Sequence, residues 1–536
     1  MNLDCGTLNS EQAARLEFRE HPGIMKTIHL KNRNQPLPAR SQAIYCGSFL
    51  VRLRGLKSSK SGIRWSSNMH GRIRLCILSI LLMIQVIPAS AQTPTPAPGP
   101  IYIVQEDDNS LWEIASRFNV SLADIVAINN ITNPDIIFPG DKLVIPGLEG
   151  LTGTLVTTAV PFGETLQSLS RQYGVDPAIL RKLNHIISPS ELYAGYELVI
   201  LQQDDQPAWT ARTSLDKGET LLELAVKADS DPWTIAQING ITSPATVLPG
   251  DTIYLPSGPS TAASGLPAAI LSAELDPLPL VQGTTAQIKI DTSQTGTLGG
   301  LLADKSLHFF GTGANSQVAL QGIHAMMDPG LYPLRLDVTS PDGSTESFEQ
   351  MVLIKSGDFL AESILGVDAE TIDPAITGPE EEWLTGLTAT VTPEKFWQGE
   401  FQLPVDEQSC LRSKFGNRRS YNGGVLLSFH TGVDFGVCSE AHPFDIYAPA
   451  DGEVVFTGLK TVRGNATIID HGWGVFSGLY HQQEIYVAAG DAVEAGQLIG
   501  KIGATGRVTG AHLHWELWVN GAQVNPLEWL EKSFPD

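Results

Sequence analysis

The sequence predicts a multidomain protein with three βααβ modules, an immunoglobulin-like antiparallel β-sandwich and a C-terminal all-β sandwich domain. Three observations predict this: a pattern that returns every 55 residues, a stretch of polar–apolar alternation, and a final stretch rich in strand and turn signals. A chain of 536 residues is too long for one hydrophobic core. Its 51 Gly and 34 Pro favour many turns and short strands over long helices.

The N-terminal segment is expected to be absent from the mature protein. Residues 1–68 hold 11 Lys/Arg against 4 Asp/Glu without a periodic pattern, and we expect them to be untranslated or disordered, with translation starting at Met69. Residues 69–91 have the features of a secretory signal peptide, with a short basic start, an apolar core of 13 residues from Leu75 to Ile87, and Ala89-Ser-Ala91 as cleavage site. A membrane anchor is the alternative, but spanning a bilayer takes about 20 residues.

Loss of this segment would leave a strongly acidic chain. The whole sequence has a net charge of −23, and removing 1–91 takes away 13 of 35 basic and 4 of 58 acidic residues, which leaves −32. This balance argues against nucleic acid as a partner, because phosphate binding needs a basic surface. No other stretch approaches 18 apolar residues, so no stable membrane insertion is expected after signal cleavage. We expect a secreted or cell-envelope protein.

A Pro-rich linker, residues 92–100, precedes three copies of one pattern. Leu111, Leu166 and Leu221 occupy the same place in each copy, and an Asn and a Gly recur 18 and 29 residues after each leucine. A fixed period marks a repeated supersecondary unit. Each copy has a short β run, two short amphipathic helices, a turn and a second β run.

These copies resemble LysM modules, small βααβ domains that bind N-acetylglucosamine-containing glycans such as peptidoglycan and chitin. The resemblance covers residues 101–146, 156–201 and 209–256, and the first copy is the closest match. It implies a shallow sugar groove formed by two loops, and in the first copy these loops contain Asp108, Asn109, Ser110, Leu111, Ile136 and Gly140. Most repeated Leu, Ile and Val positions are core positions, and glycan binding by the second and third copies stays open.

The middle of the chain carries no catalytic signature. A flexible Ser/Gly/Ala/Pro linker, 257–268, is followed by alternating strands over 269–356, with turn signals between them, which predicts the small sandwich. No cluster of His, Cys or paired carboxylates occurs in it, so a spacer or docking role is expected. Residues 357–400 are expected to be an acidic connector packed onto the last domain.

The final segment, 401–536, contains the residues suited to metal chemistry. They occur as His430-Thr-Gly-Val-Asp434, Tyr480-His481 and His512-Leu-His514. In an extended segment, residues two or four apart point to the same face. Three imidazole or carboxylate ligands plus an open position are typical of catalytic zinc sites. A lone His is more often structural, but the ordered set within one domain favours a metal centre.

This segment resembles the lysostaphin-type peptidoglycan endopeptidases from Phe401 to Leu530. The resemblance implies one Zn²⁺ per chain, held by three ligands, with two further imidazoles beside the metal water that share the proton transfers. By motif, the ligands are His430, Asp434 and His514, and the two further imidazoles are His512 and His481.

The implied function is that of a secreted zinc endopeptidase that hydrolyses peptide cross-links or stem peptides of peptidoglycan and is anchored to wall glycan by the modules. Two alternatives are a non-enzymatic regulator, which would have lost zinc residues, and a purely wall-binding protein. All five residues are present, which favours the enzyme. The cleaved bond, Gly-Gly or D-Ala to a diamino acid, stays open.

Two cysteines remain after signal cleavage, Cys410 and Cys438. A disulfide between them would close a loop of about 28 residues around the segment that presents His430 and Asp434, and by the chain-entropy model would stabilise the fold by roughly 3–4 kcal/mol. An oxidising exterior favours pairing of an even count. Free buried thiols or extra metal ligands are the alternatives.

Overall fold

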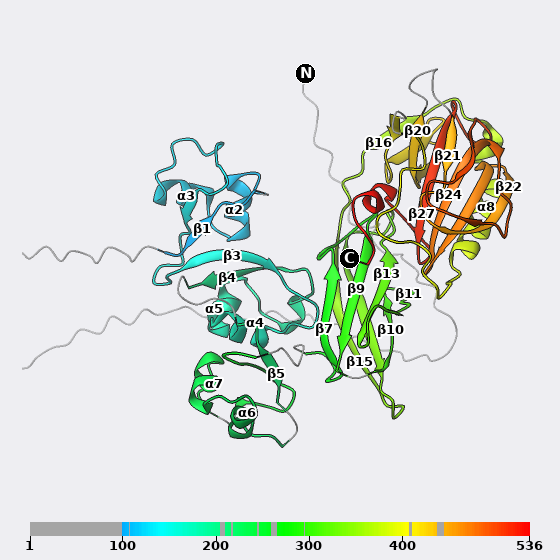
Figure 1. Cartoon of the computed structure of the whole chain (residues 1–536). Coiled ribbons are helices and arrows are strands. Elements are labelled where there is room, and N and C mark those ends of the chain that lie inside the picture. The colour runs from blue at the N-terminus through cyan, green and yellow to red at the C-terminus, as the bar shows by residue number, and fades with distance from the viewer. Residues whose placement is uncertain are drawn as a thin grey trace, which may run out of the picture. The chain divides into compact units, whose positions relative to one another are not determined.

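The computed structural model describes residues 99–106, 108–203, 209–215, 218–243, 246–258, 265–293, 295–406, 410–436 and 444–535 (Figure 1). The predicted leader 1–68, the predicted signal peptide 69–91, most of the linker 92–100 and half of the linker 257–268 lie outside these residues. Within the described ranges, no helix has the length and apolar character needed to cross a membrane.

Each of the three repeats folds as strand, helix, helix, strand. The first contains β1 (Ile101–Ile103), α2 (Leu111–Arg117), α3 (Leu122–Ile128) and β2 (Lys142–Val144). The second contains β3 (Thr154–Ala159), α4 (Leu166–Tyr173), α5 (Pro177–Leu183), the short η1 (Pro189–Glu191) and β4 (Glu197–Gln202). The third contains β5 (Arg212–Ser214), α6 (Leu221–Lys227), α7 (Pro232–Ile238) and β6 (Thr252–Tyr254). The predicted βααβ architecture is confirmed.

The recurring Asn of the repeat has a structural cause. In the first module, the Asn129 side chain donates to the carbonyls of Ile125 and Val144 and accepts from the Val144 N–H at 2.7 Å. Asn184 and Asn239 make the same contacts in the other modules. This amide therefore ties the end of the second helix to the last strand. The helices begin at capping residues, such as Ser110, whose hydroxyl accepts from the Glu113 N–H.

The first two modules share one sheet. Its order is β2-β1-β3-β4, and β1 pairs with β3 in parallel. The third module has its own two-stranded sheet of β5 and β6. It contacts the second module through Arg171, which donates to the Thr252 carbonyl at 2.7 Å, and through an Arg212–Glu164 ion pair.

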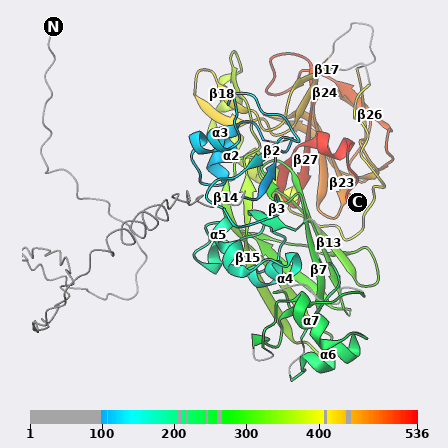
Figure 2. The same cartoon turned by 90° about the vertical axis from the view of Figure 1, so that its left-hand side faces the viewer.

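Residues 270–355 form two sheets that enclose a common core. One has the order β11-β10-β14-β15-β8 and the other β12-β13-β9-β7, and both appear in green in Figures 1 and 2. The strands are β7 (Ile270–Asp276), β8 (Leu280–Val281), β9 (Thr285–Thr292), β10 (Thr297–Leu302), β11 (Lys305–Ser306), β12 (Phe310–Gly311), β13 (Ser316–Gly322), β14 (Gly330–Thr339) and β15 (Thr345–Lys355). The alternating pattern thus forms a two-layer structure, and its immunoglobulin type stays a prediction.

The acidic segment 357–400 contributes secondary structure to the C-terminal domain. It contains β16 (Ala361–Ile364), η3 (Ala369–Ile372) and α8 (Pro374–Thr388). Strand β16 pairs in parallel with β18 of the C-terminal domain. Helix α8 packs Leu384 against Phe476 and Trp518 on the neighbouring sheet, beside which it is seen in Figure 1. The segment is therefore more than a connector, because it completes one edge and one face of the domain.

The C-terminal domain is built around a sheet of ten strands whose pairings are antiparallel. Its main path is β17-β20-β27-β24-β23-β22-β25, and a three-stranded sheet, β16-β18-β19, stands beside it. The elements are β17 (Cys410–Ser413), β18 (Arg418–Tyr421), β19 (Leu426–Phe429), β20 (Val433–Gly436), β21 (Asp445–Tyr447), β22 (Gly452–Lys460), β23 (Gly464–Gly472), β24 (Val475–Ile485), β25 (Ala492–Val493), β26 (Leu498–Ile502), β27 (His512–Val519), β28 (Ala522–Val524) and η4 (Pro526–Leu530).

Candidate metal centre

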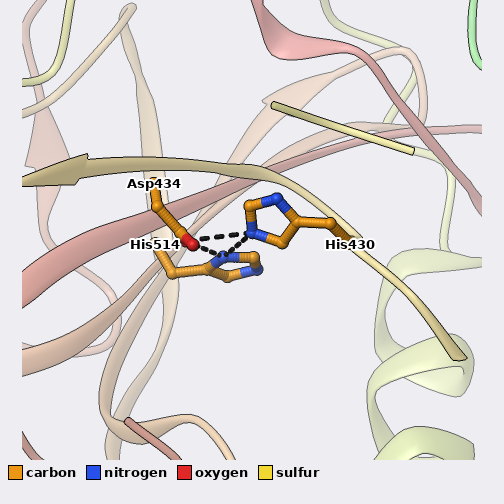
Figure 3. Close-up of side chains that lie close together, drawn as sticks. All are labelled: His430, Asp434 and His514. Atoms are coloured by element: carbon orange, nitrogen blue, oxygen red, sulfur yellow. Dashed lines mark hydrogen bonds and ion pairs between the residues drawn. The ribbon is translucent and has the colours of Figure 1, made fainter. Parts of the chain in front are cut away.

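Three of the predicted ligand residues converge on one point. Strand β20 lies next to β27, and their register places Asp434 directly opposite His514. His430 precedes β20 and turns its ring toward both (Figure 3). The His430 Nε2 lies 2.9 Å from Asp434 Oδ1 and 3.0 Å from His514 Nδ1, and the His514 Nδ1 lies 2.7 Å from the same Asp434 oxygen. All three side chains are buried.

The H-x-H spacing places two imidazoles on the same face, as expected. Leu513 lies between the two histidines and Trp515 follows the second one. Both are fully buried in the core on the other side of β27. His512 lies opposite Gly436 of β20, and its Nε2 is 3.6 Å from Asp434 Oδ1. Because side chains alternate along the strand, His512 lies on the same face as His514 and next to the three-residue cluster, but it is not a member of that cluster.

His481 reaches the same place through an irregularity in β24. Strand β24 pairs with β27 as far as Tyr480, which lies opposite His514. The register between β24 and β23 shifts in the same region. His481 itself has φ +62°, a left-handed backbone that is uncommon outside glycine. Its ring centroid lies 4.8 Å from that of His512 and 5.9 Å from that of His514. Such bulges turn a side chain to a new direction beside functional sites.

Hydrogen bonds indicate which nitrogen of each ring is free. Backbone carbonyls of Lys414, Thr505 and Gly510 lie 2.8 Å from the Nδ1 atoms of His430, His481 and His512, respectively. Because a carbonyl only accepts, each Nδ1 carries the proton and each Nε2 keeps its lone pair.

His514 has the opposite arrangement. Its Nε2 faces Thr431 Oγ1 at 3.3 Å and Glu516 Oε1 at 3.4 Å, which leaves Nδ1 for the cluster. The cluster thus offers two imidazole nitrogens and one carboxylate oxygen, a donor set that fits zinc.

Burial keeps the rings of His430, His481 and His512 neutral. It lowers the pKa of His430 to about 4 and also lowers the pKa of His512. For His481, burial and then the neighbouring imidazoles move the pKa well below its usual value. Burial alone would raise the pKa of Asp434, but hydrogen bonds with His430 and His514 hold it well below its usual range. His514 differs, because against the effect of burial its hydrogen bonds with Asp434 and Glu516 raise its pKa. At neutral pH the site therefore holds an ionised carboxylate and three neutral rings, those of His430, His481 and His512, which suits a cation.

One arginine links Asp434 to the acidic segment. Arg419 donates through Nη2 to Asp434 Oδ2 at 3.0 Å and pairs through Nε with Glu362 Oε2 at 3.2 Å. Glu362 lies on β16 and also accepts from the Asn417 amide at 2.6 Å. Sequence reasoning did not find this link, because the pairing of β16 with β18 joins residues far apart in the chain.

A second arginine links His514 to α8. Arg463 forms ion pairs with Glu380, Glu381 and Glu516 at 3.3, 2.7 and 3.4 Å, respectively. The Glu380 carboxylate also accepts the Arg463 backbone N–H at 3.1 Å. Glu516 lies against His514 Nε2 and accepts from Thr431 Oγ1 at 2.5 Å. Both arginine links were missed by sequence reasoning, although Glu516 lies within the H-x-H-x-E stretch.

Some of the residues predicted to contact glycan in the first module serve the fold, and others are exposed. Asp108 is buried, accepts from the Tyr102 hydroxyl at 2.8 Å and pairs with Arg117 at 2.7 Å. Leu111 is buried in the module's core. Their side chains therefore serve the fold, and a groove there would be lined by Asn109, Ile136 and Gly140, which are exposed. Ser110 caps α2.

The predicted disulfide falls partly outside the described residues. Cys410 begins β17 opposite Gly436 of β20, while Cys438 lies in the stretch that the structure does not describe. The pairing of these two cysteines therefore stays a prediction.

Family models match two parts of the chain. Peptidase family M23 matches residues 428–526, a segment that contains all five predicted metal and catalytic residues. This segment is an M23 peptidase domain. The LysM domain matches residues 102–146, 160–201 and 216–256, which are the three βααβ modules. The resemblances drawn from the sequence are confirmed for both parts.

Known proteins similar to this chain include two peptidoglycan enzymes and one solved catalytic domain. The peptidoglycan DD-endopeptidase ShyA of Vibrio cholerae is 39% identical over 129 residues, which are 24% of this chain and 29% of that protein. The DD-carboxypeptidase/endopeptidase Mpg of Neisseria meningitidis is 42% identical over 132 residues, again 24% and 29%. The catalytic domain of lysostaphin from Staphylococcus simulans is 28% identical, covers 23% of this chain and 93% of that structure, and has a TM-score of 0.21. The chain thus covers less than a third of each of the two full-length relatives.

Proposed function

We propose that this protein is a secreted zinc endopeptidase that hydrolyses peptide bonds in bacterial peptidoglycan. One observation carries the proposal: five side chains from β20 and the segment before it, from β24 and from β27 meet, three as a ligand set and two as neutral imidazoles beside it. The M23 domain and the names of its relatives, which include DD-endopeptidases, support the choice of reaction and substrate.

His430, Asp434 and His514 would hold the metal. Zinc, when bound at such a site, acts as a Lewis acid and lowers the pKa of water from 15.7 to about 7. Arg419 and Glu516 would orient the ligands, because each hydrogen-bonds the side of a ligand that faces away from the cluster.

His512 and His481 would carry the proton transfers. Each Nδ1–H is held by a backbone carbonyl, so Nε2 is the atom that accepts a proton. Their pKa values are lowered, chiefly by burial, so both rings are free bases at neutral pH. Either ring can accept a proton from water at Nε2, and a ring protonated there can then donate to the oxyanion or to the leaving amine.

The LysM modules would hold the enzyme on its substrate. A module that binds wall glycan raises the local concentration of peptide bonds without adding a catalytic contact.

Digestion of purified sacculi tests the proposal. The purified protein should release soluble muropeptides, a chelator should stop the release, and added zinc should restore it. A preparation that binds sacculi but releases no peptide products, with or without zinc, would favour a wall-binding protein or a regulator instead.

A further inference from the structure

The cavity beside His430, Asp434 and His514 is lined by several carboxylates and arginines, and not every arginine has a carboxylate partner. It has a volume of about 900 Å³ and is lined by strands of the M23 domain and by β16 and α8. Four carboxylates line it, and each lies within ion-pair distance of one of two arginines: Glu362 and Asp434 of Arg419, Glu381 and Glu516 of Arg463. Two further arginines, Arg412 and Arg507, also line the cavity.

Arg507 is the arginine whose charge is unmatched. It lies between β26 and β27, five residues before His512, and its side chain is half-buried. Its Nη1 donates to the Thr371 carbonyl at 3.2 Å, and its guanidinium lies 4.7 Å from the centre of the Tyr421 ring. No carboxylate of the described residues lies within 4.0 Å of it. Stacking and one carbonyl leave most of its donors open to a ligand.

The total charge of the cavity also favours an anionic ligand. With zinc on the cluster, the dication and the two paired arginines would match the four carboxylates. The charges of Arg412 and Arg507 would remain, but Arg412 is exposed and has its own interaction, so Arg507 is the group that would favour an anionic ligand. In a chain of net charge −23 such a site is not explained by a general basic surface.

We propose that Arg507 binds a free carboxylate of the substrate beside the scissile peptide bond. The inference rests on the proposed function and deepens it by naming the substrate class. A guanidinium matches a carboxylate with two parallel hydrogen bonds. In a cross-link from D-Ala to a diamino acid that has a carboxyl group on each of its two amine-bearing carbons, the carbon that bears the acylated amine carries such a carboxylate. A Gly-Gly bridge has no charged group there. Arg507 therefore selects the diamino acid cross-link over the glycine bridge.

A matched pair of substrates tests this. The first is a D-Ala–diamino acid cross-linked peptide with the free carboxylate beside the scissile bond, and the second is the same peptide with that group as a carboxamide. Charge-assisted hydrogen bonds contribute about 1.5–3 kcal/mol, so the zinc-loaded protein should favour the free acid about 10- to 100-fold in kcat/KM. Arg507→Gln should lose this preference through a higher KM for the free acid, with cleavage of the carboxamide unchanged. Arg507→Lys should keep part of it.

Controls separate a binding role from a structural one. Arg412→Gln removes a charge from the same cavity at an exposed side chain and should keep the preference. If Arg507→Gln keeps the preference, or loses activity on both substrates equally, the inference is overturned. Calorimetric binding of the two peptides to the zinc-loaded wild type and Arg507→Gln gives a readout that needs no turnover. Equal affinity of the wild type for both peptides would overturn the inference too. A wild type that discriminates in binding but cleaves neither peptide would instead contradict the proposed function.

Discussion

Replacing Glu516 by glutamine tests how the buried network supports the metal cluster. Glu516 is fully buried, accepts from Trp518 Nε1 at 2.8 Å and from Thr431 Oγ1 at 2.5 Å, and lies 3.4 Å from His514 Nε2. In Glu516→Gln, the amide oxygen can keep one of these donors, but the amide N–H₂ can face His514 Nε2 as a donor. The ring would then carry its proton on Nδ1, the atom that faces the cluster.

The expected loss follows from this change of tautomer. Removing the partner that orients a metal-bound imidazole typically costs 10- to 100-fold in metal affinity, or about 1.4–2.7 kcal/mol. The fold should tolerate the change better, because Arg463 keeps its ion pairs with Glu380 and Glu381. We expect the free energy of unfolding without metal to fall by about 1–3 kcal/mol, the cost of one weakened buried contact.

Competition between the protein and a chelator of known zinc affinity measures the effect. Glu381→Gln is the matched control, because it removes a carboxylate from the same arginine at a side chain that is 47% exposed, and it should leave zinc affinity within about twofold. Wild-type zinc affinity in Glu516→Gln would refute the proposed orienting role of this carboxylate. An equal loss in both variants would show that the charge on Arg463, rather than the ring tautomer, is what matters.

Three further predictions concern other parts of the chain. Burial raises the pKa of Glu528 to about 7, above about 4.3 in the unfolded chain, so the unfolded state ionises first and stability falls as pH rises from about 4.5 to 7. Glu528→Gln, which keeps an acceptor for the Thr285 N–H, should therefore melt at a higher temperature than the wild type at pH 8 and at a similar temperature at pH 4, and a constant difference would contradict this. Deleting 101–256 should weaken sedimentation with sacculi severalfold while cleavage of a small soluble peptide is unchanged, and undiminished sedimentation would rule out anchoring by the modules. Thiol titration of the denatured, unreduced mature protein should find neither Cys410 nor Cys438 free, and two reactive thiols would exclude the bridge.

Local patterns predicted the repeats, and together with the family resemblance they predicted the residues of the cluster. The period of the leucines marked the modules, and the i, i+2 rule placed His512 and His514 on one face of a strand that the structure contains. The same reasoning placed Asp108 in a loop that contacts glycan. In the structure this carboxylate is buried, because it accepts from the Tyr102 hydroxyl and pairs with Arg117. Burial of a polar group depends on partners that a sequence window does not show.

The parts that sequence reasoning missed depend on long-range pairing. Glu362 reaches Arg419 because β16 joins a sheet more than fifty residues further along the chain. Glu380 reaches Arg463 because α8 packs on the central sheet through Leu384. In the sequence these carboxylates belong to an acidic stretch with scattered apolar residues, so their contact with the site could be found only in the folded structure.

Zinc content and turnover of two variants of the H-x-H pair test the central claim most directly. His514→Ala removes a ligand and should lose both bound zinc and activity on sacculi. His512→Ala removes a ring beside the cluster and should keep about one zinc per chain while turnover is lost, since general acid–base groups contribute about 10²- to 10⁴-fold. A His512→Ala variant that digests sacculi at the wild-type rate, or a His514→Ala variant that retains zinc, would contradict the assignment of these two histidines.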